Sequence, residues 1–216
     1  REGFQRVSSI TKAMKDFSHP GKADRQSIDL NELITKATVI TRNRWKYAAT
    51  LQTDLATDLP MIDCYVAEIS QVLINLIVNA ADAVIEKNGD ADEASGEICI
   101  ATKDDGEAVI IEISDTGCGI PEAIRKRVFD PFFTTKDVGK GTGQGLAICY
   151  NVAVKLHGGT IDVQSTPGRG TTFRVRLPKQ APEREQEDAA GTQEPALAGA
   201  SPATEYEGYD DDDMIG

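Results

Sequence analysis

Residues 66–86 constrain the fold most, because they combine an apolar helical face with a polar stripe. The apolar residues recur at steps of three and four, as in an amphipathic helix, and comprise Ile69, Val72, Leu73, Leu76, Ile77, Ala80 and Val84. The polar stripe follows steps of four, four and three, through Gln71, Asn75, Asn79 and Asp82. Amides in so apolar a stretch cost free energy unless something satisfies them. They are either satisfied core amides or a polar wall facing a ligand or metal. We favour the wall, because neither asparagine stands at a helix cap.

Two glycine-containing segments follow. Asp115-Thr-Gly-Cys-Gly-Ile-Pro121 comes directly after a β-rich apolar run, residues 108–114, so a carboxylate stands where a strand ends. Gly139-Lys-Gly-Thr-Gly-Gln-Gly145 leads into Leu146-Ala-Ile-Cys149, which predicts free amides at a helix N-terminus, where anions are favoured. Together the two segments predict a nucleotide held between base recognition and phosphate recognition.

The acidity of the chain is concentrated at its C-terminal end. The 216 residues carry a net charge of −12, but residues 180–216 alone hold eleven acidic residues and one basic residue. The remainder holds 24 acidic and 22 basic residues and is nearly neutral. We expect residues 179–216 to form a disordered acidic tail or linker, because they hold too little apolar surface to fold. Clustered Lys and Arg are absent from the sequence, so we expect no nucleic-acid partner.

The cysteines and the hydropathy indicate a cytoplasmic domain without membrane contact. The four cysteines show no Cys-x-x-Cys spacing and no nearby His at ligand spacing, which favours reduced thiols over a zinc site. No apolar run approaches the roughly 18 residues that span a bilayer, and no signal peptide is present. The chain begins at Arg1 without Met, which suggests a piece of a larger protein, such as the cytoplasmic part of a membrane sensor.

The first 20 residues read as the end of a bundle helix and a linker. Apolar residues spaced by three and four form a seam, at Phe4, Val7, Ile10, Met14 and Phe17. This pattern is typical of a helix bundle, although an ordinary amphipathic helix of the same domain would show it too. We favour a helix that enters from a preceding domain, with a boundary at Pro20 and Gly21.

The remaining segments alternate between helical and strand patterns. We expect a helix that starts at Asn31 as its N-cap and ends near Trp45, and a strand over residues 49–55 that Pro60 terminates. A hairpin is predicted over residues 97–103 and 107–114 around an Asp-Gly turn. A short helix over 122–128, a helix over 144–156 and two strands over 160–165 and 171–177 complete the domain. Residues 129–145 have little regular pattern, which is typical of a functional lid or of a disordered loop. His157 falls in a last helical turn, which favours a structural role over a catalytic one.

The sequence resembles the catalytic, ATP-binding domain of a two-component sensor histidine kinase, in the superfamily of DNA gyrase, MutL and an ATP-dependent chaperone. Four boxes of that family stand in order: Gln71-Val-Leu-Ile-Asn-Leu-Ile-Val-Asn-Ala-Ala81, Asp115-Thr-Gly-Cys-Gly-Ile120, Phe129-Asp-Pro-Phe-Phe-Thr-Thr-Lys136 and Gly141-Thr-Gly-Gln-Gly-Leu146. One box alone would be a weak signal, whereas four collinear boxes are specific. The resemblance covers about residues 25–178 and implies a catalytic domain over 21–178. The implied fold is an α+β two-layer sandwich of Bergerat type, with a mixed, mostly antiparallel five-stranded sheet on about three helices and a long ATP lid.

The resemblance implies roles for the boxes. Asp115 would accept a hydrogen bond from the adenine amine, with Gly117 and Gly119 letting the backbone approach the base. Asn79 would ligate Mg²⁺, and Asn75 would help to position the phosphates; these two are the implied catalytic residues. Phe132 and Phe133 would anchor the lid. The implied nucleotide site comprises Asn75, Asn79, Asp115, Gly117, Gly119, Ile120, Thr135, Lys136, Lys140, Gly141, Thr142, Gly143, Gln144, Gly145, Leu146 and Thr172, with Lys136 and Lys140 facing the β- and γ-phosphates.

Asn75 helps to choose among members of the superfamily. In its ATPases and serine kinases this residue is typically Glu, a general base, whereas an amide takes no proton at neutral pH. An imidazole nucleophile needs less help, because its neutral form already carries a lone pair. The resemblance therefore implies phosphoryl transfer from ATP·Mg to a histidine of the protein's own dimerisation domain, in a homodimer, for relay to a response-regulator receiver domain. Two alternatives stay open: a nucleotide-sensing module without phosphotransfer, and an ATPase of the same superfamily.

Two departures from the family pattern qualify this expectation. Many members carry a basic residue three positions after the metal-binding Asn, where this chain has Asp82, so we expect the lid lysines to substitute for it. The phospho-accepting motif, a His followed by an acidic residue on a bundle helix, is absent, since His19 lies in Ser-His-Pro. We therefore expect the acceptor histidine to precede Arg1.

Overall fold

The structure is a computed structural model that describes residues 24–89, 95–136 and 141–179. The predictions for the N-terminal seam, for Lys140 and for the acidic tail lie outside these residues. The described elements are β1 (Gln26–Ile28), α2 (Leu30–Trp45), β2 (Ala49–Asp54), β3 (Ile62–Cys64), α3 (Val66–Asn88), β4 (Gly96–Asp104), β5 (Ala108–Asp115), α4 (Glu122–Arg125), α5 (Gly145–Tyr150), the π-helical segment η1 (Asn151–Leu156), β6 (Thr160–Thr166) and β7 (Gly170–Pro178).

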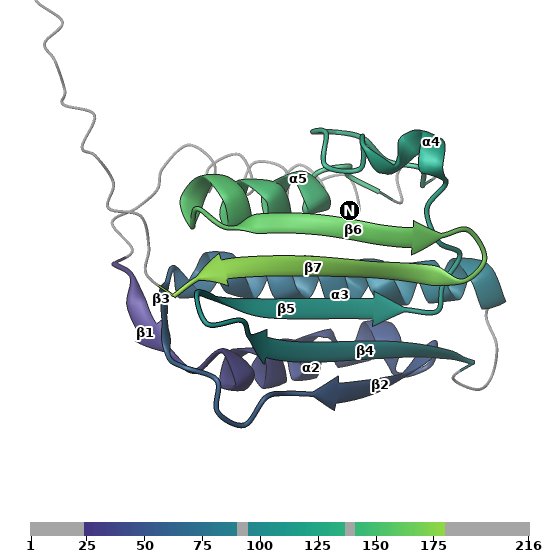
Figure 1. Cartoon of the computed structure of the whole chain (residues 1–216). Helices are drawn as coiled ribbons and strands as arrows, with labels where there is room; N and C mark the ends of the chain where they lie inside the picture. The colour runs from purple at the N-terminus through teal and green to yellow at the C-terminus, as the bar shows by residue number, and fades with distance from the viewer. Residues whose placement is uncertain (1–23, 90–94, 137–140, 180–216) are drawn as a thin grey trace, which may run out of the picture. The chain divides into compact units, whose positions relative to one another are not determined.

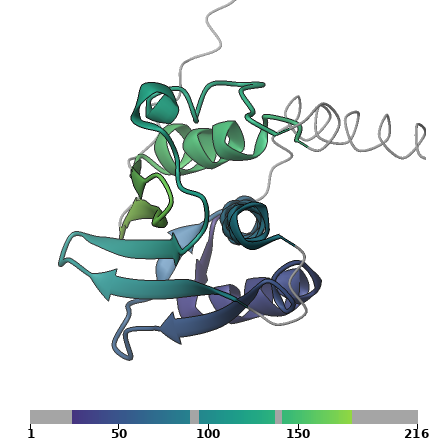
Figure 2. The ribbon, with the colours of Figure 1, turned by 90° about the vertical axis from the view of Figure 1, so that its right-hand side faces the viewer.

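A five-stranded sheet with the order β2-β4-β5-β7-β6 forms one layer of the domain (Figure 1). Only β2 and β4 pair in parallel, and the three other pairs are antiparallel. The helices α2, α3 and α5 lie on one side of this sheet (Figure 2). The predicted α+β two-layer sandwich with a mixed, mostly antiparallel sheet is therefore confirmed.

Strand alternation explains which side chains face the helices. In β7 the buried residues Thr171, Phe173, Val175 and Leu177 alternate with more exposed ones. In β5 the buried residues Val109, Ile111, Ile113 and Asp115 follow the same parity. Successive side chains of a strand point to opposite faces, so one parity packs on the helices and the other faces outward. Asp115 thus ends a core-facing row, on the helix side of the sheet.

Helix α3 supplies the central apolar surface. Eight of its residues are buried: Ile69, Val72, Leu73, Leu76, Ile77, Ala80, Ala81 and Val84. By length and composition alone α3 could span a membrane, which the search for apolar runs in the sequence missed. Here its apolar face packs into the core beneath the sheet. Its remaining face carries the polar stripe, so one helix joins the core to the functional surface.

The predicted start of α2 is wrong by two residues. Asp29, not Asn31, caps the helix, because its Oδ1 accepts hydrogen bonds from the backbone amides of Asn31 at 2.8 Å and Glu32 at 3.3 Å. The Asn31 side chain instead donates to the carbonyl of Ala56 at 2.8 Å and accepts from the Thr102 hydroxyl at 3.0 Å. The sequence correctly predicts a short polar residue at the start of the helix. Tertiary contacts decide that Asp29, and not Asn31, is the cap.

Two further features were not predicted. β3 pairs with β1 in a separate two-stranded sheet, whereas no strand was expected after Pro60. The predicted helix over residues 144–156 changes to π-helical geometry at Asn151. Beyond it, the ring of His157 is buried, with Nε2 accepting from the Tyr65 amide at 3.1 Å and Nδ1 lying 2.7 Å from the Val152 carbonyl oxygen. These contacts give His157 a structural position, as expected.

Candidate nucleotide-binding site

A cavity of about 660 Å³ opens between α3, the loop after β5 and the segments on either side of residues 137–140. Of the residues that the resemblance implies, twelve line it: Asn75, Asn79, Asp115, Gly119, Ile120, Thr135, Lys136, Gly141, Thr142, Gly143, Gly145 and Leu146. These residues come from all four boxes. The fold therefore collects into one concave surface what the sequence distributes over about seventy positions.

The two asparagines of α3 differ in their partners. The amide oxygen of Asn75 accepts from Gln71 Nε2 at 2.9 Å, and its nitrogen donates to the Gly145 carbonyl at 3.2 Å. Asn75 thus ties α3 to the first residue of α5. Asn79, one turn further on, lines the cavity, and its side chain has no hydrogen bond with any other residue that the structure describes. Asn79 therefore presents a free amide oxygen to the cavity.

Asp115 is the buried carboxylate of the site. Its Oδ1 accepts from the amides of Gly117 at 2.8 Å and Thr171 at 3.3 Å, while Oδ2 accepts no hydrogen bond from the residues described. Burial raises the pKa of Asp115 from 3.8 to about 6, against the two backbone hydrogen bonds and the charge of Lys87, which lower it. The hydrogen bonds to Oδ1 thus orient the carboxylate, and Oδ2 faces the cavity as an acceptor.

The glycines of the first glycine box have different steric roles. Gly119 has φ +72°, and a Cβ there would lie 2.8 Å from the Thr166 carbonyl carbon and 3.0 Å from Pro167 Cα. Gly119 lines the cavity. Glycine is needed at this position because φ is positive and because the β6–β7 turn passes close to it. Gly117 does not line the cavity; a Cβ there would lie 2.7 Å from the Ala83 carbonyl oxygen. A side chain at position 117 would therefore face α3, and not the position expected for the base.

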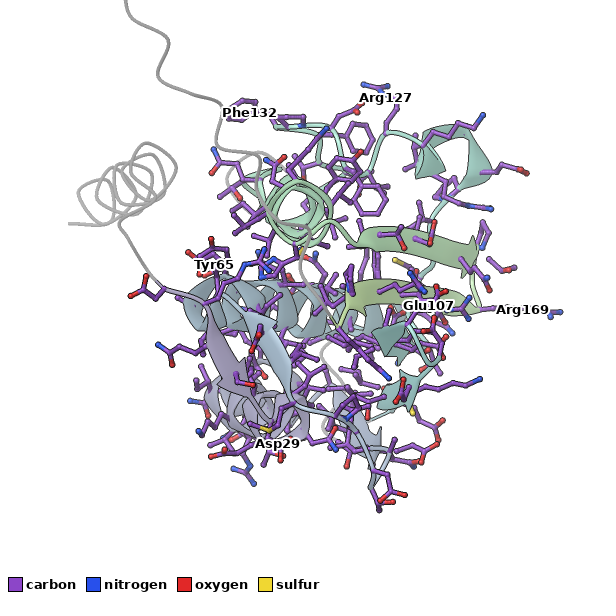
Figure 3. All side chains as sticks on the ribbon, turned by 60° about the vertical axis from the view of Figure 1, so that its left-hand side comes forward. Asp29, Tyr65, Glu107, Arg127, Phe132 and Arg169 are labelled. Carbon is purple, nitrogen blue, oxygen red and sulfur yellow. The ribbon has the colours of Figure 1, made fainter. Side chains whose placement is uncertain are left out.

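The base of the lid is held by close backbone packing. A Cβ on Gly143 would meet the Phe132 backbone, with its carbonyl oxygen 2.5 Å away, so the F box and the second glycine box pass in contact. Phe132 has φ 65°, and its side chain is 70% exposed and points outward from the domain (Figure 3). It is therefore no anchor, contrary to expectation. Phe133 lies under the guanidinium of Arg127 at 4.8 Å and lines the cavity.

Phe129 is the aromatic residue that anchors this loop. Its ring lies 6.0 Å from that of Tyr150 and 6.3 Å from that of Phe173, between centroids. Aromatic pairs at such separations are favourable in tilted and edge-to-face arrangements. Phe129 therefore fastens the start of the loop to α5 and β7, while the residues that follow it reach the cavity.

Besides Gly117, two of the described residues that the resemblance implies do not line the cavity, Thr172 and Gln144. Thr172 faces the outer side of the sheet, where its hydroxyl lies 2.9 Å from that of Ser114, so its side chain does not line the cavity. Its neighbour Thr171 lines the cavity instead, because β7 alternates. Gln144 precedes α5 and does not line the cavity. Lys140 lies outside the described residues.

The expectation for Lys136 needs a correction. Its ammonium group pairs with Asp82 Oδ2 at 2.6 Å, so in this state it neutralises the carboxylate that stands at the usually basic position. Asp82 Oδ1 pairs with Arg44, from the last turn of α2. Both residues of this second pair line the cavity, and reasoning from the boxes missed Arg44 altogether. Nothing in the local sequence of α2 indicates that its end reaches this site.

Comparisons with known proteins agree with this geometry. The family model described as histidine kinase-, DNA gyrase B-, and HSP90-like ATPase matches residues 65–181, more than half of the chain. The sensor kinase CckA of Brucella abortus (strain 2308) is 30% identical over 204 residues, which cover 88% of this chain and 21% of that protein. The chain thus spans about a fifth of the length of this relative.

Solved structures show the same likeness. The catalytic domain of the histidine kinase ThkA, in a nucleotide-free form, superposes with a TM-score of 0.61 at 32% identity, over 72% of this chain and 96% of that one. ThkA in complex with the response regulator protein TrrA gives a TM-score of 0.64 at 26% identity, over 83% of this chain and 49% of that one. The chain therefore belongs to the histidine kinase-, DNA gyrase B- and HSP90-like ATPase family, and it contains the catalytic ATP-binding domain of a sensor histidine kinase.

Proposed function

We propose that this chain binds ATP·Mg in the cavity beside α3 and transfers the γ-phosphoryl group to a histidine of a dimerisation domain, for relay to a response-regulator aspartate. The observation that carries the proposal is the pairing of two unsatisfied acceptors in one cavity. Asp115 Oδ2 and the Asn79 amide have no hydrogen-bond partner among the residues described, although both side chains line the cavity. Ligand donors or a cation would supply those partners.

Asp115 suits the recognition of adenine. Its Oδ2 is an acceptor, and the exocyclic amine of adenine is a donor, so an ionised Asp115 discriminates for adenine against a base with a carbonyl at that position. Gly119 and Ile120, from the same loop, line the cavity together with Asp115. The hydrogen bonds to Oδ1 hold the carboxylate in place before the nucleotide arrives, which reduces the ordering cost of binding.

Asn79 suits a magnesium ion that arrives with the nucleotide. An amide oxygen is a hard donor, and Mg²⁺ is commonly held by one or two protein oxygens together with phosphates and waters. Bound there, the ion would neutralise charge on the β- and γ-phosphates. Asn75, fixed by Gln71 and by the Gly145 carbonyl, would set the start of α5 against the phosphates. Thr135, Gly141, Thr142 and Gly143 would cover them from the lid.

Transfer to histidine fits the absence of a carboxylate at position 75. The neutral imidazole would attack with its own lone pair, forming a P–N bond while the bond to the bridging oxygen of ADP breaks and ADP keeps the electron pair. The chain would contribute alignment and charge neutralisation, not proton abstraction. A water nucleophile needs a base that Asn75 cannot be. We therefore rank the superfamily ATPase and a purely nucleotide-sensing module below the kinase.

The partners follow from the same proposal. The complex of ThkA with its response regulator supports a receiver-domain partner for the present protein. The homodimer formed through a dimerisation domain, the position of the acceptor histidine before Arg1 and the cytoplasmic location stay predictions. Nucleic acid and membrane are not proposed as partners of this domain.

Calorimetric titration of the 216-residue chain with ATP, with and without Mg²⁺, tests the binding half of the proposal. We expect one site, and weaker ATP binding when Mg²⁺ is withheld. Asn79→Ala should abolish that magnesium dependence while leaving adenosine binding intact, because adenosine carries no phosphate for the metal to bridge. Magnesium dependence retained by Asn79→Ala would remove Asn79 from the metal site.

A further inference from the structure

We propose that Arg44 is a phosphate-binding residue of the nucleotide site, held by Asp82 while the cavity is empty and transferred to the polyphosphate when ATP enters. The inference rests on the proposed function, because it assumes that the cavity accepts a nucleotide. It adds a residue that lies outside all four boxes, in the last turn of α2, about thirty positions before the first asparagine of α3.

The geometry places Arg44 where the phosphates would lie. Asp82 is one turn beyond Asn79 on the same face of α3, and both side chains line the cavity together with Arg44. The carboxylate is divided between two cations: Oδ1 pairs with Arg44, and Oδ2 pairs with Lys136 at 2.6 Å. α2 packs along α3, so the Arg44 backbone is fixed while its side chain extends toward the cavity.

The charges explain why a cation is needed there. An unpaired carboxylate one turn from the proposed magnesium ligand would repel a polyphosphate. Arg44, Lys136 and Asp82 together carry one positive charge, which offsets the charge of Glu86, a further carboxylate that lines the cavity. Many members of the family carry a basic residue at the position of Asp82, which is acidic here. Arg44 from α2 and Lys136 from the base of the lid supply positive charge in its place.

The strengths of these interactions favour the transfer of Arg44 from Asp82 to phosphate over a permanent ion pair that only holds α2 against α3. The side chain of Arg44 is 56% exposed, and an ion pair so open to water contributes little to stability. A guanidinium facing phosphate oxygens can form two parallel charge-assisted hydrogen bonds, which are stronger than a single exposed pair. The more enclosed Lys136–Asp82 pair, with exposures of 31% and 18%, can keep the carboxylate neutralised after Arg44 leaves.

Arg44→Gln tests the proposal, with Arg42→Gln as the matched control. Arg42 lies in the same turn of α2, carries the same charge and is exposed, but it does not line the cavity. We expect Arg44→Gln to weaken ATP binding about tenfold, the effect of one charged hydrogen bond. Adenosine binding should be unchanged, which also shows that the variant folds. Arg42→Gln should bind both ligands as the unmodified chain does.

The variant Asp82→Asn distinguishes an Arg44 that binds phosphate from an Arg44 that only forms a structural ion pair with Asp82. If Asp82 competes with the phosphates for Arg44, its neutralisation should strengthen ATP binding several-fold, because both cations become available. A strut between α2 and α3 predicts the opposite, a weaker ATP site in Asp82→Asn and Arg44→Gln alike. Equal ATP affinity of Arg44→Gln and Arg42→Gln would overturn the proposal. Failure of the unmodified chain to bind ATP would instead overturn the proposed function.

Discussion

Replacement of the buried carboxylate, Asp115→Asn, should make the ligand-free domain more stable while removing its nucleotide binding. The side chain keeps its shape, and an amide oxygen can still accept the hydrogen bonds from Gly117 and Thr171 that Oδ1 accepts now. What disappears is the charge, together with the acceptor character of the atom that faces the cavity. Stability and binding should therefore move in opposite directions.

The size of the effect follows from the pKa of Asp115. Burial raises it from 3.8 to about 6, and about two pH units correspond to roughly 3 kcal/mol. Because the folded-state pKa lies above the unfolded one, the folded state holds more protons between about pH 4 and pH 6. Stability from this group is therefore present below about pH 4 and lost as pH rises to about 6. An amide also resists burial, so we expect Asp115→Asn to gain about 1–3 kcal/mol at neutral pH.

Urea unfolding of both proteins at two pH values measures this gain. Near pH 7.5, well above the pKa, Asp115→Asn should unfold at higher urea, whereas near pH 4 the two midpoints should converge, because the carboxyl is then neutral. ATP at about 100 times its dissociation constant should add about 2.7 kcal/mol to the unmodified protein and nothing to the variant. A variant less stable than the unmodified protein near pH 7.5 would refute the reasoning from burial.

Three further predictions concern residues that line the cavity. Adenosine, which does not titrate in this range, should bind about tenfold more weakly near pH 5 than near pH 7.5, because an Asp115 with a pKa of about 6 is then mostly protonated; a flat calorimetric profile would contradict this. Gly119→Ala should lower the free energy of unfolding by about 2 kcal/mol or more, since φ is +72° and backbone atoms crowd the new Cβ. Gly145→Ala, whose Cβ would meet Asn75 only at 3.7 Å, should raise it by about 0.5 kcal/mol, and thermal or urea unfolding would distinguish the two.

The central elements of the fold could be predicted because their patterns are long. The three-and-four spacing in α3 continues over 23 residues, and its polar stripe does line the cavity through Asn75, Asn79 and Asp82. The β5 strand and the Asp115 that ends it followed from a continuous apolar run. β3 was missed because three residues are too few to show a period.

The remaining errors have two different causes. Thr172 was assigned to the site although the apolar parity of Phe173, Val175 and Leu177 indicates that Thr171 shares their face. That signal was present in the sequence and was not used. Arg44 is different, because its approach to Asp82 depends on how α2 packs against α3. No periodicity or local motif contains that information, and only the fold reveals it.

The most direct test of the central claim is to incubate the full-length protein with γ-labelled ATP and Mg²⁺ and to follow where the label goes. If the proposed transfer to histidine is correct, the protein should carry label that is lost in acid and kept in base, as expected of phosphohistidine, and Asp115→Asn should carry no such label. Label that accumulates only as free phosphate, at a rate unaffected by Asp115→Asn, would contradict it.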